Sequence, residues 1–430
     1  DVKKKSCHHN SLIVILELII PKEGAVMKAT GIVVEYNPFH NGHLHHAAKA
    51  KEQSGADIVI AVMSGQFLQR GEPAFADKWT RTEMALSAGV DVVIELPYAF
   101  ATAQASEFAR GAIELLDAAG CSSFCFGSEQ GTIEPFLKSL ELLSTERERY
   151  NQIIHDRIQT GISYPKALND AYLTLTKGSE GYADLTKPNN ILGYHYIEAA
   201  HKLNSLIKPL TIQRIGAGYH DPLEPGVAIA SATGLRNAFF EGEELTQLSP
   251  YLPSSSIRLL ERVHSEQQGF VDWQRFYPML RFTILREGPK ALSRFAEVTE
   301  GIENLIHEAA KRSETFDIFI NRVKSKRFTR TRIQRMLTHI FTGYTHQEAQ
   351  TAKHPEYIRL LGMTSHGRRY LNGQKKAIPL PIISRAADLT GNMGQLDIRA
   401  STLYLQAIGA DSLKKEYTTP PIYLGESSDK

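Results

Sequence analysis

The sequence has little of what marks a secreted or membrane-spanning protein. Its 430 residues include three cysteines, Cys7, Cys121 and Cys125, too few for a disulfide framework at this length. The longest apolar run, residues 12–20, is interrupted by Glu17 and is far shorter than the ~20 residues that span a bilayer. We therefore expect no membrane span and a cytoplasmic protein that is stabilised by burial.

The chain also has little net charge, +2. That sum argues against a uniformly basic protein that coats nucleic acid, although it does not say where the charges lie. Hydrophobic residues make up 42% and aromatic residues 9% of the chain, which argues against disorder. The length predicts roughly two to three domains.

Residues 1–26 imitate a signal peptide weakly. Lys3, Lys4 and Lys5 precede the apolar run, but no cleavage site with small residues follows it. Met27 is a better domain start, so we interpret residues 1–26 as a leader or an extension outside the functional argument.

From Met27, short β-branched runs alternate with longer amphipathic stretches, which indicates a parallel sheet covered by helices. The pattern predicts strands at 30–36, 57–63, 91–96, 122–126 and 209–215, with helices at 43–54, 79–88 and 106–119. The fold class is therefore α/β, a Rossmann-like doubly wound sheet, followed by a mainly α-helical C-terminal domain. We place the first domain at 27–245, with a helical insertion at about 133–183. Strand signals fade beyond residue 250, which predicts a helical domain at 250–410 and a tail at 411–430.

One loop carries the clearest chemistry. The first strand runs into the first helix through Asn37-Pro38-Phe39-His40-Asn41-Gly42-His43, and four of the sixteen histidines, His40, His43, His45 and His46, fall within seven residues. In a doubly wound sheet this turn lies at the carboxyl ends of the strands, where ligands bind, and a helix N-terminus offers N–H groups to phosphate. Metal binding and simple helix capping are the alternatives, but no carboxylate is adjacent for a metal.

A second motif, Ile229-Ala230-Ser231-Ala232-Thr233-Gly234-Leu235-Arg236, follows the last predicted strand. Ser231 or Thr233 can cap the next helix, and Arg236, one turn in, can hold the β- and γ-phosphates of a nucleotide. An ordinary helix cap with a surface arginine is the alternative.

Together the two motifs resemble those of the nucleotidyltransferase and class I aminoacyl-tRNA synthetase superfamily, with Ala232 in place of a serine. A longer resemblance, over nearly the whole chain from Met27, is to the bacterial tRNA(Met) cytidine acetate ligases. It includes Gly31-Ile32-Val33-Val34-Glu35-Tyr36-Asn37, Met63-Ser64-Gly65-Gln66-Phe67, Gln69-Arg70-Gly71-Glu72-Pro73-Ala74, Phe126-Gly127-Ser128-Glu129, Lys187-Pro188-Asn189-Asn190-Ile191-Leu192-Gly193 and Gln213-Arg214. The resemblance implies a ligase that activates acetate with ATP as acetyl-adenylate. It then acetylates N4 of the wobble cytidine in the anticodon loop of elongator tRNA(Met).

The resemblance also implies site residues. Catalytic roles on the phosphates fall to His40, His43 and Arg236, and Mg²⁺ is expected with the phosphates, without assigned protein ligands. Further ATP contacts are implied for the loop at 33–46 and for later positions: Val33, Glu35, Asn37, Pro38, Phe39, Gly42, His46, Gly127, Asn189, Arg214, Ser231 and Thr233. Asn189 is also an ordinary turn residue, and Asn190 is its rival.

The polar loop at 64–77 is a candidate for the acetate site or for a lid, through Gln66, Arg70 and Asp77. Arg70 could pair with the acetate carboxylate or, equally, with Glu72 or Asp77. The residues leave this open.

Positive charge gathers at 322–385, where fourteen Lys and Arg stand against Glu348 and Glu356. This segment totals +12, so the remainder of the chain totals −10. We predict a tRNA-binding surface, with Phe328 and Tyr370 available to stack on unpaired bases. A solvated basic helix face is the alternative. The predicted tRNA contacts are Lys324, Lys326, Arg327, Arg330, Arg332, Arg335, Arg368 and Arg369.

Two other functions share part of this pattern. A small-molecule adenylyltransferase, acting on a mononucleotide or phosphopantetheine, would have both ATP motifs but needs no basic helical domain. A nucleotide-binding RNA chaperone would keep the ATP loop but release no pyrophosphate.

Overall fold

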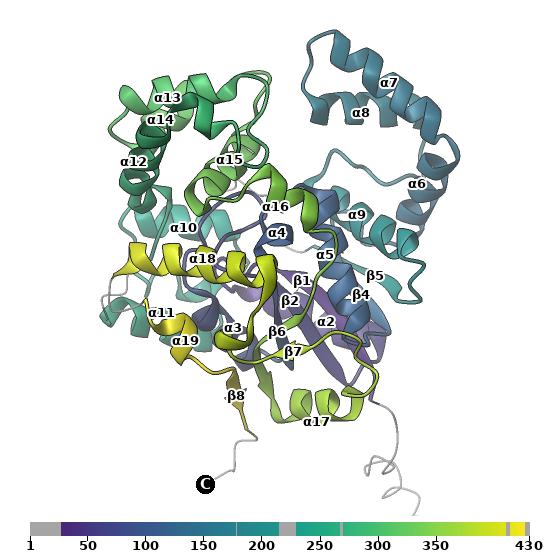
Figure 1. The fold of residues 1–430 in the computed structure, drawn as a ribbon. Helices are drawn as coiled ribbons and strands as arrows, with labels where there is room; N and C mark the ends of the chain where they lie inside the picture. Colours follow the sequence, from purple (N-terminus) through teal and green to yellow (C-terminus); the bar gives the residue numbers. More distant parts are fainter. Residues whose placement is uncertain (1–26, 178, 215–228, 267–269, 410–412, 426–430) are drawn as a thin grey trace, which may run out of the picture.

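The structure, a computed structural model, describes residues 27–177, 179–214, 229–266, 270–409 and 413–425, so the predicted leader at 1–26 lies outside it. The described residues form one eight-stranded sheet (Figure 1). Five strands run parallel in the order β5-β4-β1-β2-β3. They are β1 (Ala29–Val34), β2 (Ile58–Ser64), β3 (Val92–Leu96), β4 (Ser123–Ser128) and β5 (Lys208–Gln213). The predicted doubly wound sheet is confirmed.

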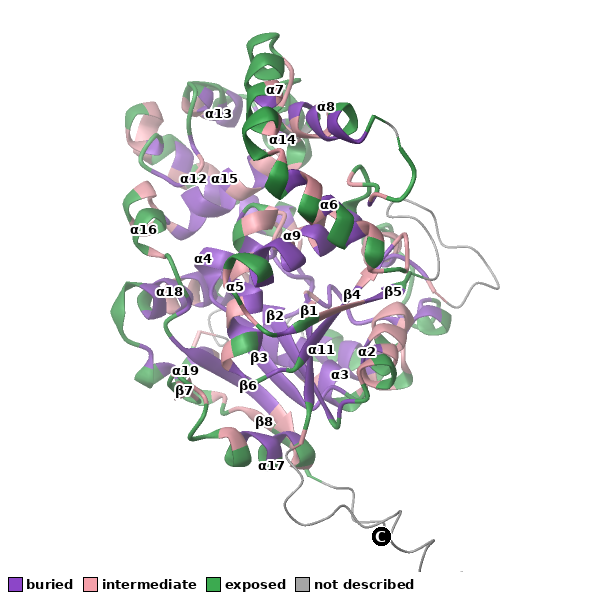
Figure 2. Ribbon diagram, turned by 90° about the vertical axis from the view of Figure 1, so that its right-hand side faces the viewer, coloured by how far each residue is buried: buried purple, intermediate pink, exposed green. Residues whose placement is uncertain are grey.

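The central strand β2 explains how the sheet is covered. Its residues are all buried, as is usual for a parallel strand with helices on both faces. Ile58, Ile60 and Val62 pack with one set of helices, and the alternating Val59 and Met63 pack with the other. On the first face lie α4 (Tyr98–Ala101), α5 (Ala105–Ala118) and α9 (Pro188–Lys202), and on the second α2 (Asn41–Ser54), α3 (Lys78–Ser87), α10 (Ala232–Phe240) and α11 (Ser254–Ser265). Figure 2 shows the strands buried between these layers.

Between β4 and α9 the chain forms α6 (Glu134–Thr145), α7 (Arg147–Gln159) and α8 (Tyr164–Thr176). These helices fall within the segment at 133–183, where a helical insertion was predicted. Figure 1 shows α7 and α8 projecting away from the sheet, on the side of the molecule that α13 and α14 also reach.

The C-terminal half is mainly helical, as predicted. It contains the 3₁₀ turns η1 (Ser249–Tyr251) and η2 (Ala386–Asp388), with α12 (Trp273–Leu292), α13 (Ile302–Lys311), α14 (Phe316–Val323), α15 (Arg330–Thr342), α16 (His346–Thr351), α17 (Ser365–Gln374), α18 (Gly391–Ile408) and α19 (Lys415–Thr418).

The sequence analysis missed three strands in this half. β6 (Ile358–Thr364) runs antiparallel beside β3, and β7 (Ile382–Ile383) and β8 (Ile422–Leu424) pair with β6. The C-terminal region therefore completes the sheet of the first predicted domain. The domain boundary near residue 245 stays a prediction. The segment at 411–430, expected as a tail, contributes both α19 and β8.

Candidate nucleotide-binding site

The loop between β1 and α2 brings two histidines together at the carboxyl edge of the sheet. His40 is the N-cap of α2: its Nδ1 accepts from the Gly42 N–H at 3.0 Å, and the His40 N–H donates to His43 Nδ1 at 3.2 Å. The two rings stack with centroids 3.8 Å apart. Because both Nδ1 atoms accept from backbone, each neutral ring carries its proton on Nε2. The cap thus leaves Nε2–H as the donor of each ring.

These histidines are neutral at pH 7. Burial, with Arg214 nearby, lowers the pKa of His40 to about 3. Burial lowers the pKa of His43 well below its ordinary value, and His40, His46 and Arg214 lower it further. Burial also lowers the pKa of His46 to about 4, against a hydrogen bond to the Cys125 carbonyl at 3.1 Å that raises it. The loop therefore offers neutral donors to an anion, beside the fixed charge of Arg214.

The low pKa of His46 predicts a loss of stability in acid. In the unfolded chain its pKa is ~6.5, so the unfolded state takes up the proton first. The stabilising effect is complete above pH 6.5 and is lost as the pH falls toward 4. His46→Gln should reduce the loss in free energy of unfolding between pH 7 and pH 5 by about 1 kcal/mol, allowing for partial exposure. Urea unfolding at both pH values measures this. His155→Gln, at an exposed position on α7, is the control. If both variants lost the same free energy of unfolding between pH 7 and pH 5, the prediction would be contradicted.

Arg214, which acts on the charge of both histidines, follows β5 and is exposed. Its NH1 donates to Asn189 Oδ1 at 3.0 Å, and Asn189 Nδ2 donates to Glu129 Oε1 at 2.7 Å. A Cβ at Gly127 would lie 3.1 Å from Arg214 Cγ, so the glycine makes room for the arginine stem. Glu129, for which the sequence predicts no role, orients this chain of contacts.

The structure separates the two rival asparagines. Asn190 is buried, its Oδ1 accepts from the Glu129 N–H at 3.0 Å, and its Nδ2 donates to the Asp184 carbonyl. These are structural bonds of the helix start. Asn189 instead contacts Arg214 at the edge of the candidate site, which favours Asn189 as the ligand-facing residue.

The second motif meets the first. Ser231 caps α10 by accepting from the Gly234 N–H at 3.0 Å, as one of the two predicted caps. Arg236 NH1 donates to the Asn37 carbonyl at 2.8 Å, and its NH2 lies 3.5 Å from Thr233 Oγ1. Arg236 therefore contacts the loop that carries His40 and His43, and Arg214 lies near both of these histidines.

The comparisons with known proteins agree with this arrangement. Residues 27–419 match the model of the HIGH Nucleotidyl Transferase family. A tRNA(Met) cytidine acetate ligase of Lysinibacillus sphaericus is 55% identical, over 92% of this chain and 100% of the relative. One of Bacillus subtilis is 42% identical, over 88% and 92%. The chain belongs to the tRNA(Met) cytidine acetate ligase family. A solved structure of Thermotoga maritima TmcAL bound with alpha-thio ATP matches with a TM-score of 0.85 and 34% identity, over 93% of this chain and 100% of that one.

Several residues expected to contact ATP in this ligase family member are occupied in shaping the loop. Glu35 Oε1 accepts from the Gln69 N–H at 2.7 Å, and Asn37 Oδ1 accepts from the Phe75 N–H at 2.6 Å. Phe39 is buried, and Pro38 follows a cis peptide bond. Val33 is half-buried within β1. The side chains of Glu35, Asn37 and Phe39 thus support the loop.

The position of the His40 ring explains why residue 42 is a glycine. A Cβ at that position would lie 2.8 Å from His40 Cε1 and 3.3 Å from Ile229 Cγ2, which is closer than side-chain atoms normally pack. The glycine therefore lets the His40 ring fold back over the helix start, as its capping bond requires.

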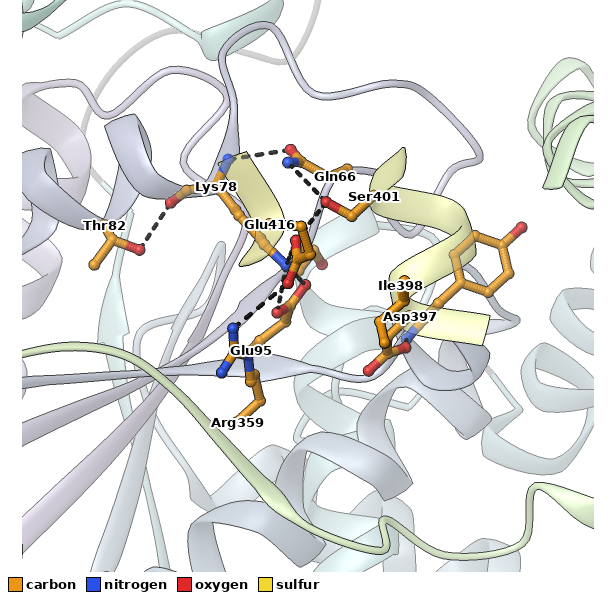
Figure 3. A network of polar contacts seen from close by, with 12 residues as sticks. Gln66, Lys78, Thr82, Glu95, Arg359, Asp397, Ile398, Ser401 and Glu416 are labelled. Atoms are coloured by element: carbon orange, nitrogen blue, oxygen red, sulfur yellow. Dashed lines mark hydrogen bonds and ion pairs between the residues drawn. The ribbon is translucent and has the colours of Figure 1, made fainter. Parts of the chain in front are cut away.

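The acetate candidates Gln66 and Asp77 make structural contacts, and Figure 3 shows those of Gln66. Gln66 is buried, accepts from the Lys78 N–H at 3.1 Å and donates to Ser401 Oγ at 3.4 Å. Asp77 caps α3 through Thr80 and pairs with Lys415 at 2.6 Å. Arg70 lies partly exposed in the same loop. Gln66 and Asp77 therefore stabilise the loop that carries Arg70.

The structure divides the predicted tRNA contacts into two groups. Lys324, Lys326 and Arg327 are exposed between α14 and α15, and α15 carries three more arginines. Arg368 and Arg369 are exposed on α17, which follows the antiparallel β6 and lies at the amino ends of the parallel strands. Figure 1 shows α17 at the opposite end of the molecule from α13 and α14. The two groups do not form one surface.

Acidic residues from outside the basic segment reduce its charge. Arg335 pairs with Glu297 at 2.8 Å, and Arg327 and Arg332 both reach Glu300, at 2.6 and 3.1 Å. Arg330 lies 3.9 Å from Asp317. The count of +12 at 322–385 thus overstates the local field in this family member.

The prediction that Phe328 and Tyr370 can stack on unpaired bases is wrong. Phe328 is 6% exposed and lies beneath Arg332, whose guanidinium is 4.9 Å from the ring centroid. Tyr370 is 2% exposed and donates to the Ala119 carbonyl at 2.9 Å. Both rings belong to the core, so they are not available to unpaired bases.

Among the described residues, no group of three or more His, Cys, Asp or Glu side chains could hold a metal ion. No helix in the same part of the chain has the length and apolar character needed to cross a membrane.

Proposed function

We propose that this chain activates acetate with ATP as acetyl-adenylate and transfers the acetyl group to N4 of the wobble cytidine in elongator tRNA(Met). The observation that carries the proposal is a loop with two neutral histidine donors, His40 and His43, that lies near Arg214 and is contacted by Arg236. Relatives that match most of the chain are named tRNA(Met) cytidine acetate ligases. The compartment that supplies tRNA, ATP and acetate together is the cytoplasm.

In the first half-reaction, an acetate oxygen attacks the α-phosphorus of ATP in line. The O–P bond forms as the bond to the bridging oxygen of pyrophosphate breaks. His40 and His43 donate to the phosphate oxygens, and Arg214 and Arg236 stabilise the charge that passes to pyrophosphate. Acetate is already anionic, so this step needs no general base.

Mg²⁺ would accompany the phosphates and neutralise part of their charge. This ion keeps much of its water and commonly binds through substrate phosphates plus one or two carboxylates. The described residues hold no cluster of three ligands, so the phosphate oxygens would be its main ligands.

In the second half-reaction, the exocyclic amine of the cytidine attacks the acetyl carbonyl. The new C–N bond forms, AMP leaves and the amine loses a proton. This amine is a poor nucleophile, so positioning of the anticodon loop over the adenylate supplies most of the rate. Arg70, partly exposed in the loop at 64–77, is our candidate for the acetate carboxylate.

Omission experiments test the proposal. Pyrophosphate release is measured with ATP, acetate and tRNA each left out in turn. We expect release that requires acetate and continues without tRNA, and acetylated cytidine only when all three are present. Release that is indifferent to acetate would contradict the proposal and favour an adenylyltransferase for small molecules.

The exposed positive charges before α15 predict a separable loss of tRNA binding. Replacing Lys324, Lys326 and Arg327 by alanine should weaken tRNA binding and reduce the slope of log affinity against log salt by about two to three. Acetate-dependent pyrophosphate release should remain, because these side chains lie outside the nucleotide loop.

The matched variant replaces Arg368 and Arg369 within α17 and Lys375 at its C-cap, three exposed charges. Because α17 lies at the other end of the sheet, we expect a much smaller effect on the same binding curve. Equal losses from both triple variants would show that the tRNA surface spans both ends of the molecule.

A further inference from the structure

Glu72 joins two parts of the molecule that have different tasks. It lies in the loop between β2 and α3, where its Oε2 accepts from Arg236 NH2 at 3.3 Å. Its Oε1 accepts from Gln334 Nε2, on α15, at 3.2 Å. The Glu72 side chain is 28% exposed and Arg236 is 15% exposed, so the contact is shielded from water in part. One carboxylate thus connects the nucleotide loop with a helix that bears predicted tRNA contacts.

Neighbouring bonds fix the Glu72 backbone to the same helix. The Gly71 carbonyl accepts from Thr338 Oγ1, on α15, and from Trp273 Nε1, on α12, both at 2.9 Å. Gly71 has a φ of +73°, and a Cβ there would collide with the backbone nitrogen of Arg335. Only glycine allows this close approach, so the loop at Glu72 is packed directly against α15.

The opposite side of α15 carries charge. Gln334 is buried, whereas Arg332, about half a turn round the helix, pairs with Glu300 at the surface. Polyanion phosphates compete with Glu300 for Arg332. Docking there acts on the same helix that holds Glu72 through Gln334.

Glu72 is not explained by nucleotide affinity alone. An anion 3.3 Å from the Arg236 guanidinium competes with phosphate oxygens for it and weakens the local positive field. A neutral side chain would serve ATP better. The second contact, to Gln334, supplies the missing reason for a carboxylate, because its two oxygens can be shared between two donors.

We propose that Glu72 is a positioning residue that couples tRNA docking on α15 to nucleotide binding at Arg236. The position of α15 sets where Glu72 lies, and Glu72 sets how much of Arg236 the phosphates can reach. This inference rests on the proposed function, because it takes Arg236 as a phosphate ligand and α15 as part of the tRNA surface. Thermodynamic linkage then requires that tRNA and nucleotide change each other's affinity by the same factor.

The test measures the dissociation constant of α,β-methylene-ATP by titration calorimetry, with the full chain alone and saturated with a tRNA(Met) transcript. We expect the transcript to tighten analogue binding threefold or more in the wild type. Glu72→Gln should tighten binding without tRNA and remove the response to tRNA. Gln334→Leu should remove the response, since leucine cannot donate to Glu72.

Controls separate coupling from general damage. Glu83 pairs with Arg262 at 2.7 Å and is 28% exposed, like Glu72, so Glu83→Gln removes a comparable ion pair elsewhere. Gln347→Leu makes the second change at an exposed position on α16. Both control variants should keep the wild-type response to tRNA. If the test variants acted only by damaging the structure, the control variants would lose the response as well.

The outcomes are distinct. An unchanged response in Glu72→Gln and Gln334→Leu, or no response in the wild type, would overturn the coupling. If the chain still forms acetyl-adenylate and acetylates tRNA, the proposed function then survives alone. A wild type that shows the coupling but no acetate-dependent pyrophosphate release would contradict the proposed function and keep the coupling.

Discussion

His43→Ala is expected to lower acetate-dependent ATP–pyrophosphate exchange by about 100- to 1,000-fold, the usual effect of removing one donor to developing negative charge. The His43 Nε2–H is a donor because Nδ1 is fixed as an acceptor by the His40 N–H at 3.2 Å. The stacked rings of His40 and His43 hold that donor at one place in the loop. The rate should fall far more than the affinity for ATP, since the charge on the phosphates grows in the transition state.

The same substitution also removes half of a helix cap, which should cost about 1 kcal/mol of stability. His43→Gln separates the two effects. A glutamine at this position of a capping box accepts from the N-cap N–H, so it should restore the free energy of unfolding but not the exchange rate. His45→Ala, at a histidine of α2 without an assigned role, should change neither. An exchange rate within tenfold of the wild type for both His43 variants would contradict the assignment.

The sequence was sufficient for the parts of the fold that local patterning determines. The five parallel strands and the helices predicted at 43–54, 79–88 and 106–119 follow from β-branched runs that alternate with amphipathic stretches. The candidate loop was predictable for the same reason, because a turn after the first strand must lie at the carboxyl edge. Here local pattern and tertiary position agree.

β6 could not be predicted locally. Its sequence carries Arg359 near its start, and a charged residue there argues against a buried strand. Arg359 is 1% exposed because Glu416, 57 residues later in the chain, lies 3.5 Å away. A sequence pattern that considers only neighbouring residues cannot show that Arg359 and Glu416 pair.

The predicted charge of the segment at 322–385 was too high for a related reason. Counting charge within 322–385 leaves out Glu297, Glu300 and Asp317, which lie just before it and pair with its arginines. The exposure of Phe328 and Tyr370 depends on which helices cover them. Charge and stacking arguments therefore need the tertiary structure, whereas the order of the motifs does not.

Lys78→Met is expected to lower the free energy of unfolding by about 3 to 5 kcal/mol, because it leaves two buried carboxylates without their cation. Lys78 is 1% exposed, and its Nζ lies 2.8 Å from Glu95 Oε2 and 2.8 Å from Glu416 Oε2. Burial alone would lower the pKa of Lys78, but the carboxylates of Glu416 and Glu95 outweigh it and raise the pKa. Figure 3 shows the three charges meeting Arg359 in the interior.

Removing the Lys78 ion pairs should also disturb the loop that belongs to the candidate site. Lys78 begins α3, and its N–H holds Gln66 at the start of the loop that carries Arg70 and Glu72. Urea unfolding of the full chain measures the loss, with Lys49→Met as the control, because the exposed pair of Lys49 and Glu52 should contribute at most about 1 kcal/mol. Adding Glu95→Gln to Lys78→Met removes the carboxylate that is left unpaired, while Glu416 keeps Arg359 at 3.5 Å, and should recover part of the stability. A loss below 1 kcal/mol for Lys78→Met would mean that water or a neighbouring cation neutralises the two carboxylates, and that the C-terminal segment is not held to the sheet by charge.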